Sequence, residues 1–576
     1  MRSPTGSRDG LIWDDNGLGP VARWARQPQI EVIDRVCRRA LRIDDDDAAR
    51  DHCIVTFHCN GDFSKLYNVD TIRGKYMMRI SLPVDPRNKT RAEALTLRLV
   101  HRSTDIPVPK VIAFQDFAGQ DELGFEWLLM ECIPGKPAYC RWRKMTDTQK
   151  EALTKRVAEF HSQLFRCGNL GRGFRSIGTL GTLPESDNHS TNPEPGPIVD
   201  PVFFAGPRYS YPIPRGPFHS SHDWLRAYLN LIISEHSTAL AKAQTQDDKD
   251  HAEMVLRLAR KLMRLVHKVF PSLLNPAENT VLWHDDLSLK NIMVDDQGKV
   301  TGVIGWECVS ALPRWMACQM PAFLRGAGRT TKPDRQCYTN VSQSQSSTAE
   351  SLPSQGQEDD EWTLDNEGKT ELYWIHLMEY EQTNLRKIYY DRMRQLRPEW
   401  DKEVEESELK VDFLGAVSRC GTQFYPVRVE QWADAIERRE FVSLMHVLRM
   451  GINRSVDQET VPGPQSRSGT PTPSFSGRVS TAGGGGAARP GTGGVTSPSV
   501  TFRTPQWKSR GGHGQQESDS RPSSPRPGSP LPVRPGSSMS TASTSTLVSS
   551  GSTVTVKQPG GSGSTTSVAL VRTRMV

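Results

Sequence analysis

The chain has 576 residues, enough for two to four domains, and carries 72 Lys and Arg against 66 Asp and Glu. From Val461 onward, about six residues in ten are Ser, Thr, Gly or Pro, and 12 basic residues face two acidic ones. Such a composition buries too little apolar surface to fold, so residues 456–576 are predicted to be a disordered tail. The rest of the chain is slightly acidic, so the overall basic charge gives no indication of a nucleic-acid partner, and none is predicted.

The sequence shows no sign of export or of a membrane anchor. Its N-terminus lacks the apolar core of a signal peptide, and no run approaches the ~20 apolar residues of a membrane span. The ten cysteines include no CxxC pair and no zinc-like spacing with histidine. We therefore expect reduced cysteines, a cytoplasmic protein and no membrane partner.

The first part of the chain predicts a small α+β lobe at residues 26–134, after a flexible leader at residues 1–25. A helix is expected at 27–43. The segment "CIVTFHCNGDFSKLYNVDTIRGKYMMRISL" then alternates β-prone runs with turns, which predicts three antiparallel strands. A helix follows at "NKTRAEALTLRLVHR", and two more strands follow at "VPKVIAFQD" and "GFEWLLMEC". This lobe has five strands, with one helix between the third and the fourth.

Residues 135–455 predict a mainly helical second lobe. Thr146 and Gln149 form a candidate capping box before the first helix. Helices are expected at 223–243 and 250–269, and a β-hairpin at "NIMVDDQGKVTGVIGW". Residues 170–220, rich in Pro, Gly and Ser, predict an ordered insertion or lid, and residues 337–361 predict a mobile loop. The fold class is thus α+β.

The segment "HDDLSLKN" carries the pattern that could do chemistry. Phosphoryl transfer needs gripped phosphates, a metal ion and a carboxylate beside the acceptor hydroxyl. The spacing predicts Asp286 as the catalytic base, Asn291 as a magnesium ligand and His284 as a brace for the loop. The alternative interpretation is an exposed polar turn without catalytic function.

Several motifs in order carry a family resemblance from about Ile54 to Trp432. They include "GDFSKLYNV", "LGFEWLLMECIPG" and "LWHDDLSLKNIMVDDQGKVTGVIGWE". With them the chain resembles the aminoglycoside phosphotransferase and choline-kinase-like family, especially its fungal branch. The resemblance implies a two-lobed protein-kinase-like fold that binds ATP between the lobes. It also implies phosphoryl transfer to a hydroxyl group of a small molecule.

The resemblance also implies roles for residues of the first lobe. "CNGDFSKLYNV" matches the phosphate-covering turn, with an ordinary hairpin as the alternative. Arg79 matches the basic residue that binds the α and β phosphates. Glu93 matches the carboxylate that pairs with this basic residue. The adenine-binding hinge matches a segment that could also be a plain buried strand. The turn and hinge residues concerned are Gly61, Ser64, Met130, Glu131, Cys132 and Ile133.

The chain departs from the family at one position. The family motif I-D-W-E reads Ile304-Gly305-Trp306-Glu307 here. The missing Asp normally holds magnesium, and Asn291 alone is a poor replacement because magnesium usually requires one or two carboxylates. Glu307 could serve as a substitute ligand. Alternatively the protein is a pseudokinase that binds nucleotide or a metabolite as a scaffold or sensor, or a weak activity persists, or the glycine is an allelic or sequencing difference. Whether the protein is an enzyme therefore stays open.

The tail suggests partners of its own. It contains six Ser-Pro or Thr-Pro pairs, which are sites for proline-directed kinases, and phosphorylation there would reduce its positive charge. Its "SPLPVRPG" segment fits an SH3-type domain. The alternative is an unregulated solvating tail. Neither the acceptor substrate nor the oligomeric state is indicated by the sequence.

Overall fold

The computed structural model describes residues 8–15, 19–43, 53–168, 173–181, 193–270, 277–338 and 369–450. All of the described residues belong to one compact unit. The tail predicted at 456–576 and most of the loop predicted at 337–361 lie outside the described residues. Both stay predictions.

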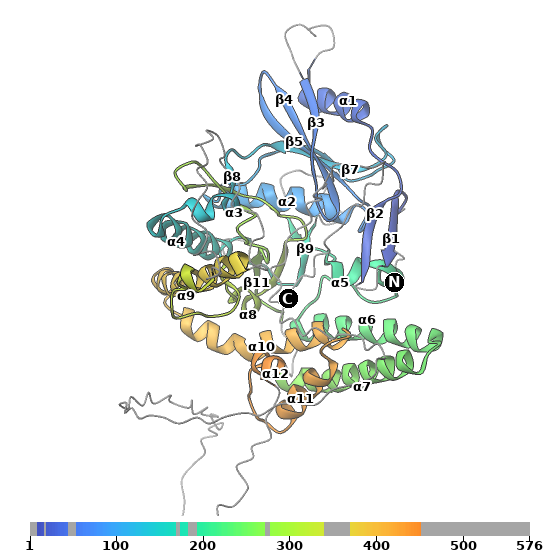
Figure 1. Ribbon diagram of the computed structural model, residues 1–576. Helices are drawn as coiled ribbons and strands as arrows, with labels where there is room; N and C mark the ends of the chain where they lie inside the picture. Colours follow the sequence, from blue (N-terminus) through green and yellow to red (C-terminus); the bar gives the residue numbers. More distant parts are fainter. Residues whose placement is uncertain are drawn as a thin grey trace, which may run out of the picture. The chain divides into compact units, whose positions relative to one another are not determined.

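The N-terminal lobe is built on a five-stranded antiparallel sheet (Figure 1). Its strands are β3 (Cys53–Asn60), β4 (Ser64–Thr71), β5 (Gly74–Ser81), β6 (Val111–Gln115) and β7 (Glu126–Glu131). They lie in the order β3-β4-β5-β7-β6. Helix α2 (Asn88–Ser103) connects β5 to β6. The predicted five strands, with one helix between the third and the fourth, are confirmed.

The two faces of this sheet pack against different helices, because successive strand residues point to opposite sides. In β7, Leu128 and Met130 join the core that includes α2, while Trp127 and Leu129 join the core beneath helix α1. Helix α1 (Ile30–Leu41) contributes buried residues from one of its faces to that second core. Strand β7 is therefore apolar at four successive positions.

The first described residues form a β-hairpin, whereas the sequence analysis places a flexible leader at 1–25. Strands β1 (Leu11–Asp15) and β2 (Pro20–Trp24) pair antiparallel. Alternate apolar residues of the hairpin pack on a small core that draws from both lobes. The buried members of that core are Leu82, Val84, Val199 and Phe204. The strands are short, and their sequence carries only a weak β-strand pattern. The hairpin forms because tertiary packing stabilises it.

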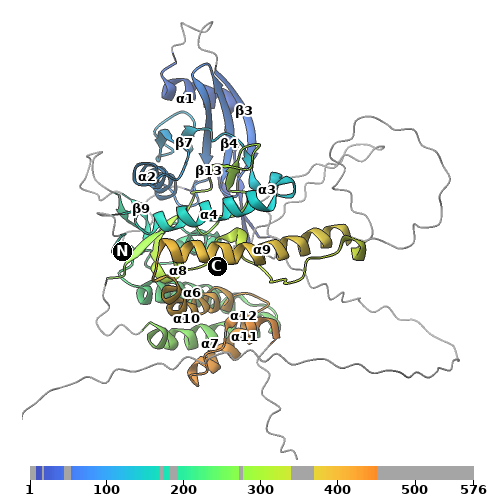
Figure 2. The ribbon, with the colours of Figure 1, turned by 90° about the vertical axis from the view of Figure 1, so that its left-hand side faces the viewer.

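The second lobe is mainly helical, as predicted. Its longer helices are α4 (Asp147–Leu164), α6 (Ser221–Lys242), α7 (Gln246–Val269), α9 (Lys369–Leu396), α10 (Trp400–Cys420) and α11 (Pro426–Glu437), with the shorter α3 (Ala138–Arg141), α5 (Pro201–Phe204), α8 (Arg314–Ala317) and α12 (Leu444–Met450). The capping box of Thr146 and Gln149 is present at the start of α4. Helices α4 and α9 lie side by side (Figure 2). This arrangement completes the two-lobed, protein-kinase-like fold expected from the sequence.

Short strands connect the lobes and hold the candidate site. The predicted hairpin consists of β12 (Ile292–Val294) and β13 (Val300–Val303), and β12 also pairs with β8 (Lys136–Pro137), just after the first lobe. A second small sheet contains β11 (Thr280–Trp283), β14 (Ser310–Pro313), β9 (Gly178–Gly181) and β10 (Glu194–Pro195). Because β9 pairs with β14, the described part of the insertion at 170–220 is anchored to the second lobe.

Among the described residues, none of the helices combines the length and the apolar character that crossing a bilayer requires.

Candidate functional site

The loop between β11 and β12 is fixed at its first residue by His284. This side chain is fully buried. Its Nε2 donates a hydrogen bond to the carbonyl oxygen of Ile304 over 3.0 Å, and its ring meets the Trp306 ring edge-on at 4.8 Å between centroids. The histidine thus ties the loop to the segment that follows the β12–β13 hairpin.

The same loop brings Asp286 and Asn291 together. The Nδ2 group of Asn291 donates to the Asp286 carboxylate over 2.9 Å and to the Asp286 carbonyl over 2.8 Å. The main-chain carbonyl of Asn291 accepts a hydrogen bond from the main-chain amide of Ile304 at 2.9 Å. The spacing in the sequence therefore corresponds to a real pair, with both side chains only partly buried.

Gly305 lies directly against this pair. Its φ is +80°, a left-handed conformation that glycine adopts without strain. A Cβ added here would lie 2.7 Å from both Cγ and Nδ2 of Asn291. Residue 305 is therefore well placed to act together with Asn291, but any side chain there would have to displace the amide.

Four charged side chains meet where the two lobes join. Arg79 of β5 pairs with Glu93 of α2 at 2.7 Å, as the resemblance implies. Arg79 also lies 3.2 Å from Oε1 of Glu307, and Lys89 of α2 lies 2.6 Å from the same oxygen. We call Arg79, Lys89, Glu93 and Glu307 the charge tetrad. Its exposed side-chain fractions are 9%, 1%, 2% and 19%.

The charges of Glu307 and Lys89 are stabilised by their neighbours in the tetrad. Burial acts to raise the pKa of Glu307, but Lys89 and Arg79 outweigh it and lower that pKa to about 2. Burial acts to lower the pKa of Lys89, but Glu307 and Glu93 raise it above its ordinary value. Glu307 is therefore a carboxylate, and Lys89 a cation, at neutral pH.

Lys89 is the member that the sequence analysis missed. It lies four residues before Glu93 in α2, so both face the same side of the helix. This spacing was the available signal, but a Lys and a Glu four apart usually form a solvent-exposed pair. Full burial of a lysine is rare unless it is paired.

Residues 59–316 match the model of the phosphotransferase enzyme family. This stretch is similar to that family, and we refer to it as the phosphotransferase-family domain. The match runs from the end of β3 to helix α8 and so includes the loop and the tetrad. The resemblance found in the sequence motifs is confirmed.

Two similar proteins of known fungi differ from the chain at most positions. A subtelomeric hrmA-associated cluster protein of Aspergillus fumigatus is 25% identical over 335 residues, which cover 51% of this chain and 62% of that protein. A clavilactone A biosynthesis cluster protein of Ampulloclitocybe clavipes is 27% identical over 240 residues, which cover 41% of this chain and 54% of that protein. The chain thus spans about 60% of the first relative and about half of the second.

Among solved structures, the ADP-bound aminoglycoside phosphotransferase APH(2'')-Ib is similar to 72% of this chain over 97% of its own length, with 11% identity and a TM-score of 0.35. Because this similarity is low, the fold of the phosphotransferase-family domain is defined by its own strand order and lobes, as described above.

The turn after β3 reaches the tetrad. The amide of Gly61, which is exposed, donates to the carbonyl of Ser64 at 2.8 Å. The Ser64 side chain is buried beside Glu307 and helps to lower the pKa of that carboxyl. Next to it, Phe63 meets Phe204 of the insertion edge-on at 5.1 Å. The turn is therefore held by contacts with both lobes.

The predicted hinge, residues 130–133, is the end of β7 and the start of the connection to β8. Met130 is buried in the sheet. The amides of Glu131 and Cys132 donate to the carbonyls of Lys110 and Lys75 at 2.9 and 3.0 Å. These two amides are already used within the protein, so they are not free to bind an adenine edge. Ile133 packs against Gly302, whose added Cβ would lie 2.5 Å from Ile133 Cγ2.

The residues present do not fit a magnesium ion. Gly305 offers no carboxylate, and the Glu307 carboxylate is held by two cations. Asn291 donates its Nδ2 to Asp286 and has only its amide oxygen to offer a metal ion. Within the described ranges, no three His, Cys, Asp or Glu side chains are grouped so that they could hold a metal ion. Magnesium usually requires one or two carboxylates together with phosphate and water oxygens.

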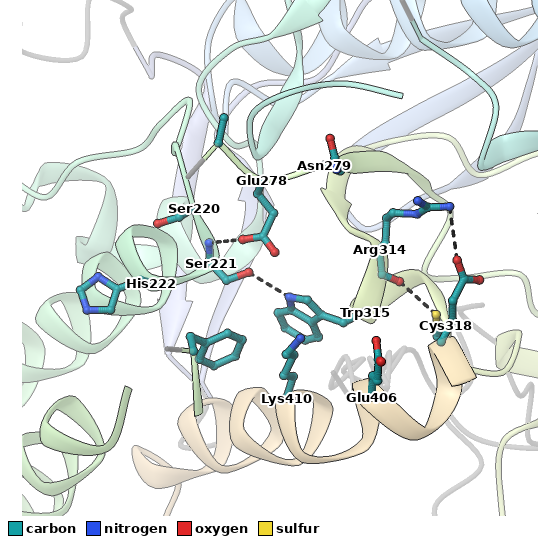
Figure 3. Close-up of a pocket in the computed structure, with 13 residues that line it drawn as sticks. Ser220, Ser221, His222, Glu278, Asn279, Arg314, Trp315, Cys318, Glu406 and Lys410 are labelled. Atoms are coloured by element: carbon teal, nitrogen blue, oxygen red, sulfur yellow. Dashed lines mark hydrogen bonds and ion pairs between the residues drawn. The ribbon is translucent and has the colours of Figure 1, made fainter. Parts of the chain in front are cut away.

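Two cavities lie in the second lobe. The larger, of about 540 Å³, is lined by the start of α6, by α8 and by α10. Its Glu406 and Lys410 side chains rise from α10 toward Trp315 (Figure 3). The smaller, of about 30 Å³, includes Asp285 and Cys308, which neighbour Asp286 and Glu307. No predicted site residue is among the described residues that line either cavity.

Proposed function

We propose that the phosphotransferase-family domain transfers a phosphoryl group from ATP to a hydroxyl group of a small molecule. The observation that carries this proposal is the 2.9 Å hydrogen bond from Asn291 to the Asp286 carboxylate. It lies in a family-typical loop that His284 fixes. The absence of a carboxylate at Gly305 makes the transfer slow.

The chain supplies a base and a positioning amide. Asp286 accepts the proton of the acceptor hydroxyl, a role that requires a carboxylate within hydrogen-bond reach of that hydroxyl. Asn291 holds this carboxylate in place with its amide. General base catalysis of this kind contributes roughly 10²- to 10⁴-fold to a rate.

The first lobe supplies the phosphate contacts. Arg79 is buried and held by Glu93, and its Nε has no hydrogen-bond partner among the described residues. A buried donor without a partner is costly, so Arg79 fits an anionic ligand such as a nucleotide phosphate. Bound ATP would supply the phosphoryl group.

A second candidate is a nucleotide-binding protein without transfer activity. The observation that favours it is the engagement of Glu307 by Lys89 and Arg79, because the one carboxylate near Gly305 is then unavailable as a metal ligand. Under this alternative, ATP raises the melting temperature of the protein but is not consumed.

The test compares Asp286→Asn with Asp296→Asn in the full chain. Asp296 lies at the turn of the β12–β13 hairpin and is largely exposed, so it serves as the matched control. We expect Asp286→Asn to reduce ADP release from ATP by roughly 10²-fold or more and Asp296→Asn to leave it unchanged. An Asp286→Asn variant with the wild-type rate would contradict the proposal. Binding without any turnover in the wild type would favour the second candidate.

A further inference from the structure

The two cations of the charge tetrad share one oxygen. Arg79 and Lys89 come from a strand and a helix, yet both contact Oε1 of Glu307, at 3.2 and 2.6 Å. Placing two like charges this close in a buried site is unfavourable without a counterion. Glu93 of α2 pairs with Arg79, and Glu307 adds a carboxylate from the second lobe that both cations share.

The carboxylate of Glu307 is surrounded as a bound phosphate would be. It receives contacts from strand β5 through Arg79, from helix α2 through Lys89 and from the turn after β3 through Ser64. The resemblance implies phosphate contacts for two of these elements, β5 and the turn after β3, and Lys89 adds helix α2 to them. Phosphate oxygens and carboxylate oxygens are interchangeable acceptors for guanidinium and ammonium donors.

The cation pair also has capacity left for a ligand. Arg79 Nε is buried and has no partner within the described part of the chain. Within the described ranges, the Lys89 ammonium group donates to Glu307 at 2.6 Å and makes a long 3.4 Å hydrogen bond to Ser81. Because the residues near Gly305 do not fit a divalent cation, these side chains are the fixed positive charge available for a polyphosphate.

We propose that Arg79 and Lys89 bind the phosphates of a nucleoside di- or triphosphate without a divalent cation, and that Glu307 is a resident counterion which the phosphates displace. This inference rests on the nucleotide site of the proposed function but not on phosphoryl transfer. It makes Lys89 a phosphate-binding residue and gives Glu307 the role of an internal competitor.

The first experiment uses the wild-type full chain. Binding of ADP and of inorganic tripolyphosphate is measured by calorimetry, once with EDTA and once with magnesium. We expect both probes to bind with EDTA, at least as tightly as with magnesium, because the free polyphosphate carries more negative charge. Binding that requires magnesium would overturn the inference. Binding of ADP alone, without tripolyphosphate, would also overturn it, because the cation pair would then not be the grip.

The second experiment changes the counterion and the cation separately. Glu307→Gln keeps the shape but removes the competing charge, so we expect ADP and tripolyphosphate to bind about threefold or more tightly with EDTA. Lys89→Met should weaken both by about tenfold or more, and Lys89→Arg should restore binding. Lys75→Met is the matched control, because that side chain is 80% exposed in the same lobe. It should bind as wild type does.

The outcomes separate this inference from the proposed function. Unchanged or weaker binding by a folded Glu307→Gln variant would overturn the competitor role of Glu307. If Lys89→Met or Glu307→Gln fails to fold, the wild-type measurements with EDTA and the Lys89→Arg variant still test whether the cation pair binds phosphates without a metal ion. Tight metal-free binding without any ATP turnover would leave this inference standing and remove transfer. Transfer with strictly magnesium-dependent binding would do the reverse.

Discussion

Asn291 donates its side-chain amide to the carboxylate of Asp286 over 2.9 Å. Both residues lie in a loop of eight residues whose first member, His284, is bonded to Ile304 beyond the hairpin. A candidate base is thus held by a neighbouring amide, and that amide touches the position of the missing family carboxylate, Gly305. The candidate site contains the Asp286 carboxylate and lacks a carboxylate at position 305.

The hydrogen bond between these residues predicts the effect of Asn291→Ala. Without its donor, the Asp286 carboxylate loses its fixed orientation. We expect ATP turnover to fall by roughly 10²-fold, whereas stability falls by only about 1 kcal/mol because a partly exposed hydrogen bond is lost. Measurements of ADP release and of thermal unfolding test both expectations. They are made with Asn291→Ala alone and with Asn291→Ala combined with Gly305→Asp. Asn230→Ala, exposed on α6, is the control, and equal losses in both variants would contradict the prediction.

Restoring the carboxylate in Gly305→Asp predicts a gain in turnover. We expect ADP release to rise at least tenfold, or ~1.4 kcal/mol in activation free energy. The φ of +80° should cost about 1 kcal/mol of stability. Gly305→Ala is the matched control, because it has the same backbone strain and the same contact with Asn291 but no carboxylate. If alanine raised turnover as much as aspartate, the missing charge would not be the limiting defect.

The charge tetrad predicts non-additive effects on stability. Lys89→Met leaves Glu307 with Arg79 as its remaining cation in the tetrad, and loss of one partner of a buried ion pair typically costs about 3–5 kcal/mol. The double variant Lys89→Met with Glu307→Gln removes both charges, so we expect it to be more stable than Lys89→Met alone. Chemical denaturation of the wild type, both single variants and the double variant measures this. Additive losses would show that Lys89 and Glu307 act independently.

Glu126 predicts a pH dependence of stability near neutrality. Burial raises the pKa of this carboxyl from 4.5 to about 7, although the amide of Arg87 donates to it at 2.5 Å. The folded protein therefore holds this proton more tightly than the unfolded chain does. The stabilisation is complete below pH 4.5 and is lost as the pH rises toward 7. Burial of Asp85 raises its pKa to about 6 and acts in the same direction.

We therefore expect the wild-type melting temperature to fall between about pH 5 and pH 7.5, and the Glu126→Gln variant to show a smaller fall, by roughly 3 °C or more. Differential scanning calorimetry across this range is the measurement, with the exposed Glu31→Gln as control. Parallel curves for wild type and Glu126→Gln would show that the residue does not titrate differently on folding.

The N-terminal hairpin predicts that residues 1–25 stabilise the protein. Its Trp13 and Leu11 pack on the small core shared by the lobes, and Arg8 donates to the carbonyl of Phe204 at 3.0 Å. Deleting residues 1–25 should lower the midpoint of urea unfolding, since apolar burial contributes about 25 cal/mol per Å². An unchanged midpoint would support the flexible leader predicted from the sequence.

Features of the fold that depend on local pattern were predictable. The five strands and their single helix follow from runs of alternating or continuous apolar residues between turn signals. The capping box of α4 follows from Thr146 and Gln149 alone. The pairing of Asp286 with Asn291 could be predicted because both lie in one short loop, where spacing in the sequence limits distance in space.

Only the tertiary structure decided the environment of the charges. Lys89 and Glu307 are separated by 218 positions, and no local pattern states that a lysine will be buried against a carboxylate from the other lobe. For the same reason the sequence leaves Glu307 as a possible metal ligand, whereas in the fold this carboxylate contacts Arg79 and Lys89. The sequence determined the local elements and the reactive loop, because neighbouring residues specify these. Packing between distant segments determined which charges meet, because burial makes an ion pair depend on every element around it.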